Sequence, residues 1–513
     1  MSLTSFFHRS ATAASQVLAG FNIDSFTKVL EAAPVGVSYD AAAAASAEGR
    51  ATLDLCVRLL ARLYPRLAIV GEKEDGLRRS LVRVARSINP ELSVTASADD
   101  ARSMLVVGNT AVTPKLRPVY VGSNGWISRV STFKPVRCGR STNPFGAGAA
   151  ACFGAANLFR LIFSESLEGG ELDDDLTVSL YDYDRTGNRR RNPPLGPVTL
   201  RDTHLVGLGA IGHGAVWALS RLHNLSGELH LIDPELVDLG NLQRYVLANQ
   251  QHAGRSEKSQ LCANLLRKTK LQVRAHRCSW DEYVEKHDDW RFEQVAVAVD
   301  SAADRIAIQA SLPRWIVNAW TQPGDLGCSR HDFLSRSACL MCMYLPSQKR
   351  KDFDTMVAEA LGLLPEKQLV TGLLYTNAPV GRAFVEKVAQ ALTIAVEPLL
   401  PFQDKPLRTF YSDAICGGIV LRLKGEPHQS SGAVEARAQV PMAFQSALAG
   451  IMLAAELVLH AQGRRSPPPV STKVNLLRPV GVYLSFDDQK HPSGTCICQD
   501  ADYIEAYRRK YES

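Results

Sequence analysis

A glycine-rich loop and a carboxylate on the apolar segment after it are the first residues in this sequence that could do chemistry. The loop, Gly207-Leu-Gly209-Ala-Ile-Gly212, follows one apolar run and opens a helix-like segment. Backbone N–H groups in such a loop can approach a nucleotide phosphate closely. The next apolar run ends in Asp233, 21 residues after Gly212, where a carboxylate reaches a ribose hydroxyl. The pair predicts nucleotide binding, and so far an NAD-dependent dehydrogenase fits as well.

The polar residues that follow do not suit a dehydrogenase. Asn241 and Arg244 come soon after Asp233, Lys258 opens a helix-like segment, and Asp300 follows another apolar run. An amide and two cations could converge on phosphates, and a carboxylate at a strand end could hold a magnesium ion. This set of residues predicts a nucleoside triphosphate as the ligand.

In this order, the residues resemble the adenylation domain of the ThiF/MoeB superfamily, to which the ubiquitin-activating enzymes belong. The resemblance is strong over about residues 200–345 and loose in the carboxyl-terminal portion. It implies that ATP is cradled by Gly207, Gly209 and Gly212, its ribose bound by Asp233, its phosphates held by Asn241, Arg244 and Lys258, and Mg²⁺ bound by Asp300. Two positions depart from the family pattern, Glu235 and Tyr245, and neither removes a phosphate or metal ligand.

The resemblance implies adenylation of a carboxylate, and we expect the substrate to be the carboxyl terminus of a ubiquitin-like protein. Such sites are normally completed by an arginine from a partner adenylation domain, for which the first half of the chain is the natural donor. With a degenerate first domain and a helical insert, the chain resembles the activating enzymes of bacterial ubiquitin-like conjugation operons linked to phage defence, the BilD-like kind, more than the short sulfur-carrier enzymes. Two alternatives remain: a sulfur-carrier-protein adenylyltransferase of the thiamin or molybdenum-cofactor type, and a nucleotide-binding scaffold pseudoenzyme.

Two cysteine pairs point to a structural metal. Cys339 and Cys342 lie where the family carries half of a zinc site, and Cys496 and Cys498 lie where it carries the other half. Four thiolates would form a closed tetrahedral Zn²⁺ site. The second pair has only one intervening residue, so four reduced, partly buried thiols are the alternative.

Formation of a thioester requires a further cysteine, and we expect it to be Cys416. It precedes a small-residue helix, has glycines beside it and lies outside the zinc pairs. Cys328, on a glycine-containing loop, is the competing candidate, and a core position without a catalytic role is the third interpretation.

These residues must be positioned by short apolar strands that alternate with helices, a pattern typical of doubly wound α/β folds. We expect a degenerate, inactive adenylation-like domain (1–183), a linker (184–198), the first part of a Rossmann-like adenylation domain (199–345), a helical catalytic-cysteine insert (346–420), and the completion of that domain with a zinc-bound tail (421–513). Small-residue helices at 143–157 and 441–456 suggest a weak internal repeat.

Composition and charge limit the classes of protein to which this chain can belong. The 513 residues are 46% hydrophobic and 21% charged, which is ordinary for a globular protein and excludes disordered and collagen-like chains. A net charge of +6 is too small to argue for nucleic acid. We expect a cytoplasmic protein without a secretory signal, whose partners are a ubiquitin-like modifier and a conjugating enzyme, with no nucleic acid and no membrane. Its adenylation domain would pair within the chain as a pseudo-dimer or between chains as a homodimer.

Overall fold

The computed structural model divides the chain into two compact units, residues 1–345 with 440–513 and residues 346–439. It describes residues 3–71, 76–110, 115–183, 192–287, 290–345, 353–411, 440–464, 470–480, 484–486 and 488–512. The larger unit contains two sheets, and we call the parts built on them the first lobe (3–183) and the second lobe (192–345 and 440–512). The α/β, doubly wound fold predicted from the sequence is confirmed.

The first lobe contains a seven-stranded sheet in the order β3-β2-β1-β4-β5-β6-β7. Its strands are β1 (Val35–Tyr39), β2 (Arg66–Gly71), β3 (Ser93–Thr95), β4 (Ser103–Val107), β5 (Arg117–Asn124), β6 (Ile127–Ser131) and β7 (Asp175–Ser179). Its helices are α1 (Phe7–Ser15), α2 (Ile23–Ala32), α3 (Ala41–Ala45), α4 (Ala47–Leu60), α5 (Gly76–Ile88), the 3₁₀ helix η1 (Ala98–Asp100) and α6 (Phe145–Ile162). Side-chain caps begin several of them: Asp40 caps α3 and Ser46 caps α4.

The second lobe contains an eight-stranded sheet in the order β10-β9-β8-β11-β12-β13-β14-β15. Its strands are β8 (Val198–Val206), β9 (Leu225–Ile232), β10 (Lys270–His276), β11 (Gln294–Val297), β12 (Trp315–Thr321), β13 (Leu326–Asp332), β14 (Ser471–Val474) and β15 (Leu484–Phe486). Its helices are α7 (Ala210–Leu219), η3 (Leu239–Gln243), α8 (Lys258–Leu266), α9 (Trp280–Glu285), α10 (Ala302–Ala310), α11 (Leu340–Tyr344), α17 (Ala443–Ala461), η8 (Ile497–Gln499) and α18 (Ala501–Tyr511).

The two sheets share one topology. In each, the first strand of the lobe pairs in parallel with the strands on both of its sides, and the fifth strand begins an antiparallel edge. In each, a long apolar helix, α6 or α17, immediately precedes a strand of that edge. The repeat suggested by the two small-residue helices therefore extends to the order and direction of the strands.

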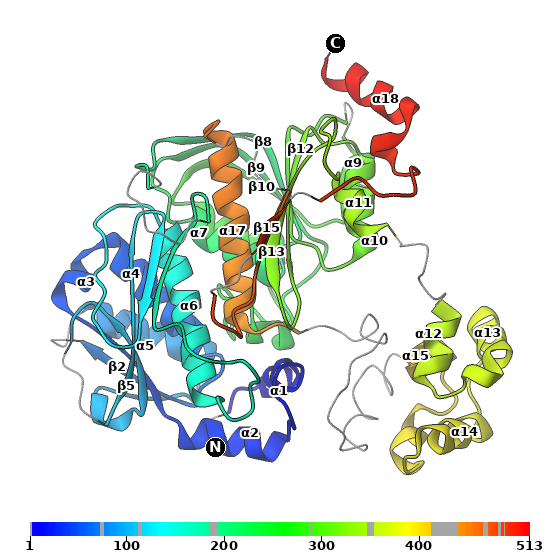
Figure 1. Ribbon diagram of the computed structural model, residues 1–513, viewed down its shortest axis with the longest axis horizontal. Coiled ribbons are helices and arrows are strands. Elements are labelled where there is room, and N and C mark those ends of the chain that lie inside the picture. Colours follow the sequence, from blue (N-terminus) through cyan, green and yellow to red (C-terminus); the bar gives the residue numbers. More distant parts are fainter. Residues whose placement is uncertain are drawn as a thin grey trace. The chain divides into compact units, whose positions relative to one another are not determined.

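Helices α6 and α17 are long and apolar enough to cross a membrane, yet 94% of each is buried within the fold. Helix α17 packs against both α7 and α6, as Figure 1 shows. Gly214 of α7 and Gly450 of α17 allow the closest approach, because a Cβ added at Gly450 would lie 2.1 Å from the carbonyl oxygen of Ile211. These helices form the core between the two sheets.

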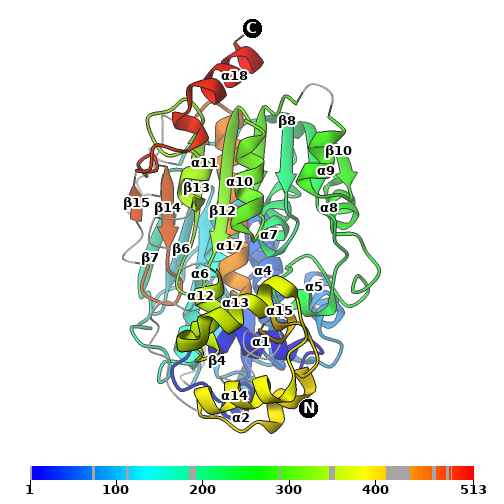
Figure 2. The same cartoon turned by 90° about the vertical axis from the view of Figure 1, so that its right-hand side faces the viewer.

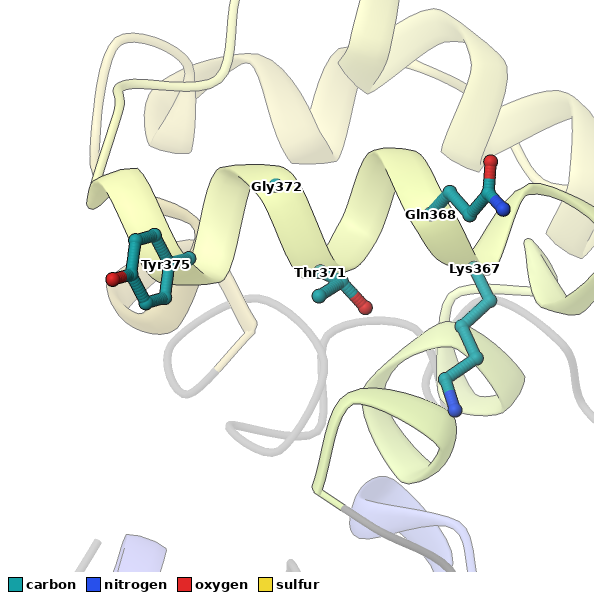
Figure 3. A pocket seen from close by; sticks show the side chains of 5 residues that line it. All are labelled: Lys367, Gln368, Thr371, Gly372 and Tyr375. Carbon is teal, nitrogen blue, oxygen red and sulfur yellow. The ribbon is translucent and has the colours of Figure 1, made fainter.

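The smaller unit is helical in its described part, residues 353–411. It comprises α12 (Phe353–Ala360), η4 (Leu364–Glu366), α13 (Lys367–Thr376), α14 (Arg382–Leu392), η5 (Glu397–Phe402) and α15 (Leu407–Phe410) around its own apolar core. Figure 3 shows an open hollow along α13, lined by Lys367, Gln368, Thr371, Gly372 and Tyr375. Tyr375 is 92% exposed, and none of these five belongs to the sites described below.

Candidate nucleotide site and four-cysteine cluster

The glycine-rich loop joins β8 to α7 at the carboxyl edge of the parallel strands. Gly207 has a φ of 89°, and a Cβ there would lie 2.7 Å from the backbone of Ala298, so no other residue fits without strain. Gly209 is the N-cap of α7, and within the part of the chain that the structure describes no side chain caps this helix end. The N–H groups at the start of α7 are therefore available to an anion, as phosphate binding at a helix N-terminus requires.

Asp233 follows β9 and supports this loop. Its carboxylate accepts hydrogen bonds from the backbone N–H groups of Leu208, at 2.7 Å, and Glu235, at 2.9 Å. Burial raises the pKa of Asp233, although Lys258 acts in the opposite direction. Asp233 was predicted to bind a ribose hydroxyl, and in the structure its carboxylate fixes the backbone of the loop.

Lys258 is the first residue of α8, and its side chain is buried. Its ammonium lies 3.9 Å from Oδ1 of Asp233 and forms an ion pair with Glu235. Burial opposes its charge, but Tyr245, Asp233 and Glu235 outweigh that effect and raise the pKa of Lys258. A fixed positive charge therefore stands beside the loop at neutral pH.

Asn241 lies in the 3₁₀ helix η3, and Arg244 is the C-cap residue at the end of that helix. Asn241 accepts a hydrogen bond from the N–H of Asp238, at 2.9 Å, in a capping box that fixes the turn. Nη1 of Arg244 is buried and has no hydrogen-bond partner among the residues that the structure describes. Because a buried guanidinium N–H is costly to leave unpaired, this atom marks a place for an anionic ligand.

Asp300 is exposed in the loop between β11 and α10. Buried Arg305 fixes this loop by donating to the carbonyl oxygens of Asp300, at 3.2 Å, and Ser301, at 3.3 Å. Burial lowers the pKa of Arg244, and the negative charge of Asp300 acts in the opposite direction and raises it. An exposed carboxylate near these cations fits the Mg²⁺ ion that accompanies a nucleotide.

The first lobe also reaches this site. Arg9 of α1 lies against Gly240 of η3, where an added Cβ would come within 3.3 Å of its Cγ, and its charge lowers the pKa of Arg244. Buried Arg62 of α4 donates to the carbonyl oxygens of Tyr245, at 2.6 Å, and Ala248, at 2.8 Å. Sequence reasoning assigned no role to Arg9 or Arg62, and no local motif marks either of them.

The four paired cysteines lie together. The Sγ atoms of Cys339 and Cys342 are 3.8 Å apart, and those of Cys339 and Cys496, and of Cys342 and Cys498, are each 3.5 Å apart. Four thiolates around one Zn²⁺ at about 2.3 Å would be separated by about 3.8 Å. The observed spacing therefore fits a tetrahedral zinc site, despite the short second pair.

The tail after this cluster packs on its own lobe. Tyr507 of α18 is buried against Phe333, with ring centroids 5.0 Å apart, and the hydroxyl of Tyr511 donates to the carbonyl oxygen of Leu312 at 3.0 Å. The cysteine cluster and α18 thus attach the carboxyl-terminal segment to the second lobe.

Of the two candidate thioester cysteines, the structure describes only Cys328. Cys416 lies outside the described residues. Cys328 is fully buried on β13, 3.3 Å from Nη2 of Arg330 and 3.5 Å from the hydroxyl of Tyr183. Arg330 in turn forms a buried ion pair with Glu456 at 2.7 Å. Cys328 is therefore part of the packed interior where the lobes meet, inaccessible to a protein substrate in this structure.

Comparisons with known proteins found two family models, a relative and a solved structure that match this chain. The ThiF family model matches residues 199–480, and the model of prokaryotic E2 family C matches residues 38–164. The uncharacterized protein y4jF of Sinorhizobium fredii (strain NBRC 101917 / NGR234) is 52% identical over 513 residues, all of this chain and 98% of that protein. A crystal structure of E. coli MccB matches 57% of this chain with 12% identity and a TM-score of 0.34, and the match spans 65% of MccB, under two thirds of its length.

Proposed function

The chain belongs to the ThiF family of adenylyltransferases, and from this premise we propose that it activates a ubiquitin-like protein. The proposed reaction begins when a carboxylate oxygen at the modifier's carboxyl terminus attacks the α-phosphorus of ATP. A new oxygen–phosphorus bond forms, the bond to pyrophosphate breaks, and an acyl-adenylate results. Negative charge on the phosphate oxygens would be stabilised by Arg244, Lys258 and Arg9, and Mg²⁺ held at Asp300 would add to this charge stabilisation.

The observation that carries this proposal is the buried Nη1 of Arg244, which has no hydrogen-bond partner among the described residues. A folded chain that buries a guanidinium N–H without a partner loses stability unless a ligand supplies the acceptor. The free helix end at Gly209 and the buried cation of Lys258 favour a phosphate as that ligand. Asn241 and Asp300 complete the proposed set.

We propose that the first lobe serves as the inactive partner of an intrachain pseudo-dimer. Its sheet repeats the strand order of the second lobe, while its β1 is followed by Asp40 and an alanine-rich segment in place of the glycine-rich loop. Arg9 would then be the arginine that a partner domain contributes. The contacts of Arg62 with the backbone of Tyr245 and Ala248 support this role, because they tie the lobe to the segment that carries Arg244.

The match of residues 38–164 to a prokaryotic E2 family raises the question of a second thioester cysteine in the first lobe. Its described cysteines are Cys56, Cys138 and Cys152. Cys56 and Cys152 are fully buried, and burial raises the pKa of Cys138 to about 12. Since the thiolate is the nucleophile, these three are poor candidates, and we propose that a separate conjugating enzyme accepts the modifier.

For the thioester step, we propose that the thiolate of Cys416 attacks the carbonyl carbon of the acyl-adenylate and AMP leaves. The modifier would then pass to the conjugating enzyme, in the cytoplasm and in bacterial defence against phage. If the protein were instead a sulfur-carrier adenylyltransferase, the modifier would end as a thiocarboxylate and no enzyme thioester would be needed.

The test of this proposal is a non-reducing gel of the full-length protein incubated with ATP, Mg²⁺ and the ubiquitin-like product of a neighbouring gene. We expect a thiol-sensitive adduct that is lost in Cys416→Ala and retained in Cys278→Ser, a matched control on a half-buried cysteine outside both sites. An adduct that persists in Cys416→Ala would refute the nucleophile. A thiocarboxylate on the modifier without an adduct would favour the sulfur-carrier alternative.

A further inference from the structure

A group of ionisable side chains away from the nucleotide loop gathers on the face of the second sheet that α9 covers. Asp202 and His204 come from β8, and His230 comes from β9. Each can present one ligand atom, and these three atoms lie within 4.8 Å of one another. Figure 2 shows β8 and β10 at this side of the lobe, with α9 next to them. None of the three residues has a role in the proposed adenylation.

The backbone at Asp202 is held in an unusual conformation. Its φ is 40°, in the left-handed region, and the pairing of β8 with β9 shifts register between Leu200 and Thr203. Such a bulge inserts an extra residue and re-aims a side chain, often near a functional site. Here Oδ1 of Asp202 lies 3.8 Å from Nε2 of His204, while Oδ2 accepts a hydrogen bond from the N–H of Glu293 at 3.0 Å.

The surroundings of His230 resemble the second shell of a metal ligand. Its Nε2 lies 3.2 Å from Oε1 of Glu228, a contact that fixes the proton on Nε2 and leaves a lone pair on Nδ1. That Nδ1 lies 2.8 Å from the hydroxyl of Tyr283 and 3.1 Å from Nε2 of His276. A metal-binding imidazole commonly has a carboxylate behind one nitrogen and the lone pair of the other nitrogen directed toward the ion.

The protons around Tyr283 do not satisfy every nitrogen. Nε2 of His204 lies 3.0 Å from the same hydroxyl, which has only one proton to give. The proton can go to Nδ1 of His230 or to Nε2 of His204, but not to both. The nitrogen that does not receive it keeps its lone pair toward the group, unless it carries a proton of its own. A cation among these atoms would use that lone pair.

The group is open to solvent on the side of Asp202. The side chain of Asp202 is 35% exposed, so an ion can reach the group from solvent.

We propose that Asp202, His204 and His230 bind a divalent transition-metal ion of the zinc type, at a site separate from the four-cysteine cluster. Two imidazoles and a carboxylate suit Zn²⁺ and its neighbours better than Mg²⁺ or Ca²⁺, which prefer oxygen ligands alone. The hydroxyl of Tyr283 stands beside the three ligands as a further oxygen donor. The ion would connect β8 and β9, the two strands that lead to Gly207 and Asp233.

The experiment uses the full-length protein, stripped with a chelator and reloaded with Co²⁺ alone. Thiolate ligands give cobalt an intense charge-transfer band, whereas nitrogen and oxygen ligands give only weak visible bands. The Co²⁺ bound at the four-cysteine cluster can therefore be measured separately from the Co²⁺ bound at the proposed site. The variants are Asp202→Asn, which keeps an oxygen for the N–H of Glu293, and His230→Gln. The matched control is His287→Gln, whose ring lies 5.0 Å from that of Tyr283 but outside the ligand set.

We expect the wild type and His287→Gln to bind one Co²⁺ per chain beyond the amount that the thiolate band reports. Asp202→Asn and His230→Gln should each lose that equivalent and keep the thiolate band unchanged. The proposal is overturned if the wild type binds no metal beyond the thiolate-bound amount, if both ligand variants keep the extra equivalent, or if the control loses it too. Circular dichroism of each variant verifies that a loss does not come from unfolding.

Discussion

Nζ of Lys258 lies 3.9 Å from Oδ1 of Asp233, so a residue expected at the phosphates and the residue expected at the ribose are neighbours in the folded chain. Lys258 also pairs with Glu235, where the family more often has aspartate. The longer side chain of Glu235 still reaches the ammonium, which explains how this departure leaves the charge arrangement intact. A bound nucleotide would compete with Glu235 for Lys258, since Glu235 is largely exposed and free to turn away.

The first prediction concerns Arg9. Arg9→Ala should lower the rate of ATP–pyrophosphate exchange by about 10²-fold, because one preorganised donor to developing charge contributes about that factor. Arg9 is exposed, so the free energy of unfolding should change by no more than about 0.5 kcal/mol. Lys28→Ala, on the exposed face of α2, is the matched control and should leave both quantities unchanged. Equal exchange rates in Arg9→Ala and the wild type would exclude Arg9 from the site.

A second prediction concerns the four-cysteine cluster. Because a structural zinc site contributes folding free energy directly, Cys342→Ser should lose the thiolate-bound metal and lower the melting temperature. Strong chelation of the wild type should lower it in the same way. Cys278→Ser, outside the cluster, should keep the metal and the melting temperature. Metal analysis together with differential scanning calorimetry checks this, and a Cys342→Ser protein with full metal content would contradict it.

The third prediction tests the crossing of α7 and α17. Gly450→Ala places a Cβ 2.1 Å from the carbonyl oxygen of Ile211 and 2.6 Å from the N of Ala215, so the helices must separate. Overpacking of this kind costs about 1–3 kcal/mol. Gly372→Ala, in α13, places its new Cβ more than 4 Å from every described atom apart from its chain neighbours and its own helix backbone, and should instead gain about 0.5–1 kcal/mol. Urea unfolding measures both, and equal effects of the two substitutions would refute the close crossing.

Asp54 provides the fourth prediction, on pH. Its carboxylate joins α4 to the second lobe through Trp217 Nε1, at 2.9 Å, and Arg221 Nη2, at 2.5 Å. Burial alone would raise its pKa, but Arg58 and Arg221 lower the pKa to about 2. Because the folded-state pKa lies below the unfolded value of about 3.9, this stabilisation is complete above about pH 4 and disappears as the pH falls through about 2.

Asp54→Asn should therefore lower the free energy of unfolding by about 2–3 kcal/mol at pH 7 and by much less at pH 2. Urea unfolding of both proteins across this range measures the difference. Asp281→Asn, an exposed position on α9, is the control and should show no such dependence. A difference between Asp54→Asn and the wild type that stays constant down to pH 2 would contradict the assignment.

The nucleotide loop could be predicted because its requirements are local. Gly207 needs a positive φ and Gly209 must open a helix, and both needs are visible in a short run of residues. Strand ends were predictable for the same reason: Asp233 and Asp300 follow apolar runs, and parallel strands bring such ends to one edge.

Long-range relationships could not be predicted in this way. Arg9 meets Gly240 only because α1 folds against η3, and nothing in the sequence near Arg9 indicates that contact. The group of Asp202, His204 and His230 depends on the β-bulge and on the register of β8 with β9. The equivalence of the two lobes was visible only as two alanine-rich helices, because sheet order is a property of the pairing of strands and not of their sequences.

The most direct test of the account is ATP–pyrophosphate exchange by the full-length protein with and without a ubiquitin-like protein whose carboxyl terminus is intact. We predict exchange that requires this terminus, falls by at least about 10²-fold in Asp300→Ala and Lys258→Ala, and is kept in Lys268→Ala, an exposed lysine just after α8. Exchange that persists in Asp300→Ala and Lys258→Ala, or a wild-type protein that binds ATP yet exchanges no pyrophosphate with any such modifier, would contradict it.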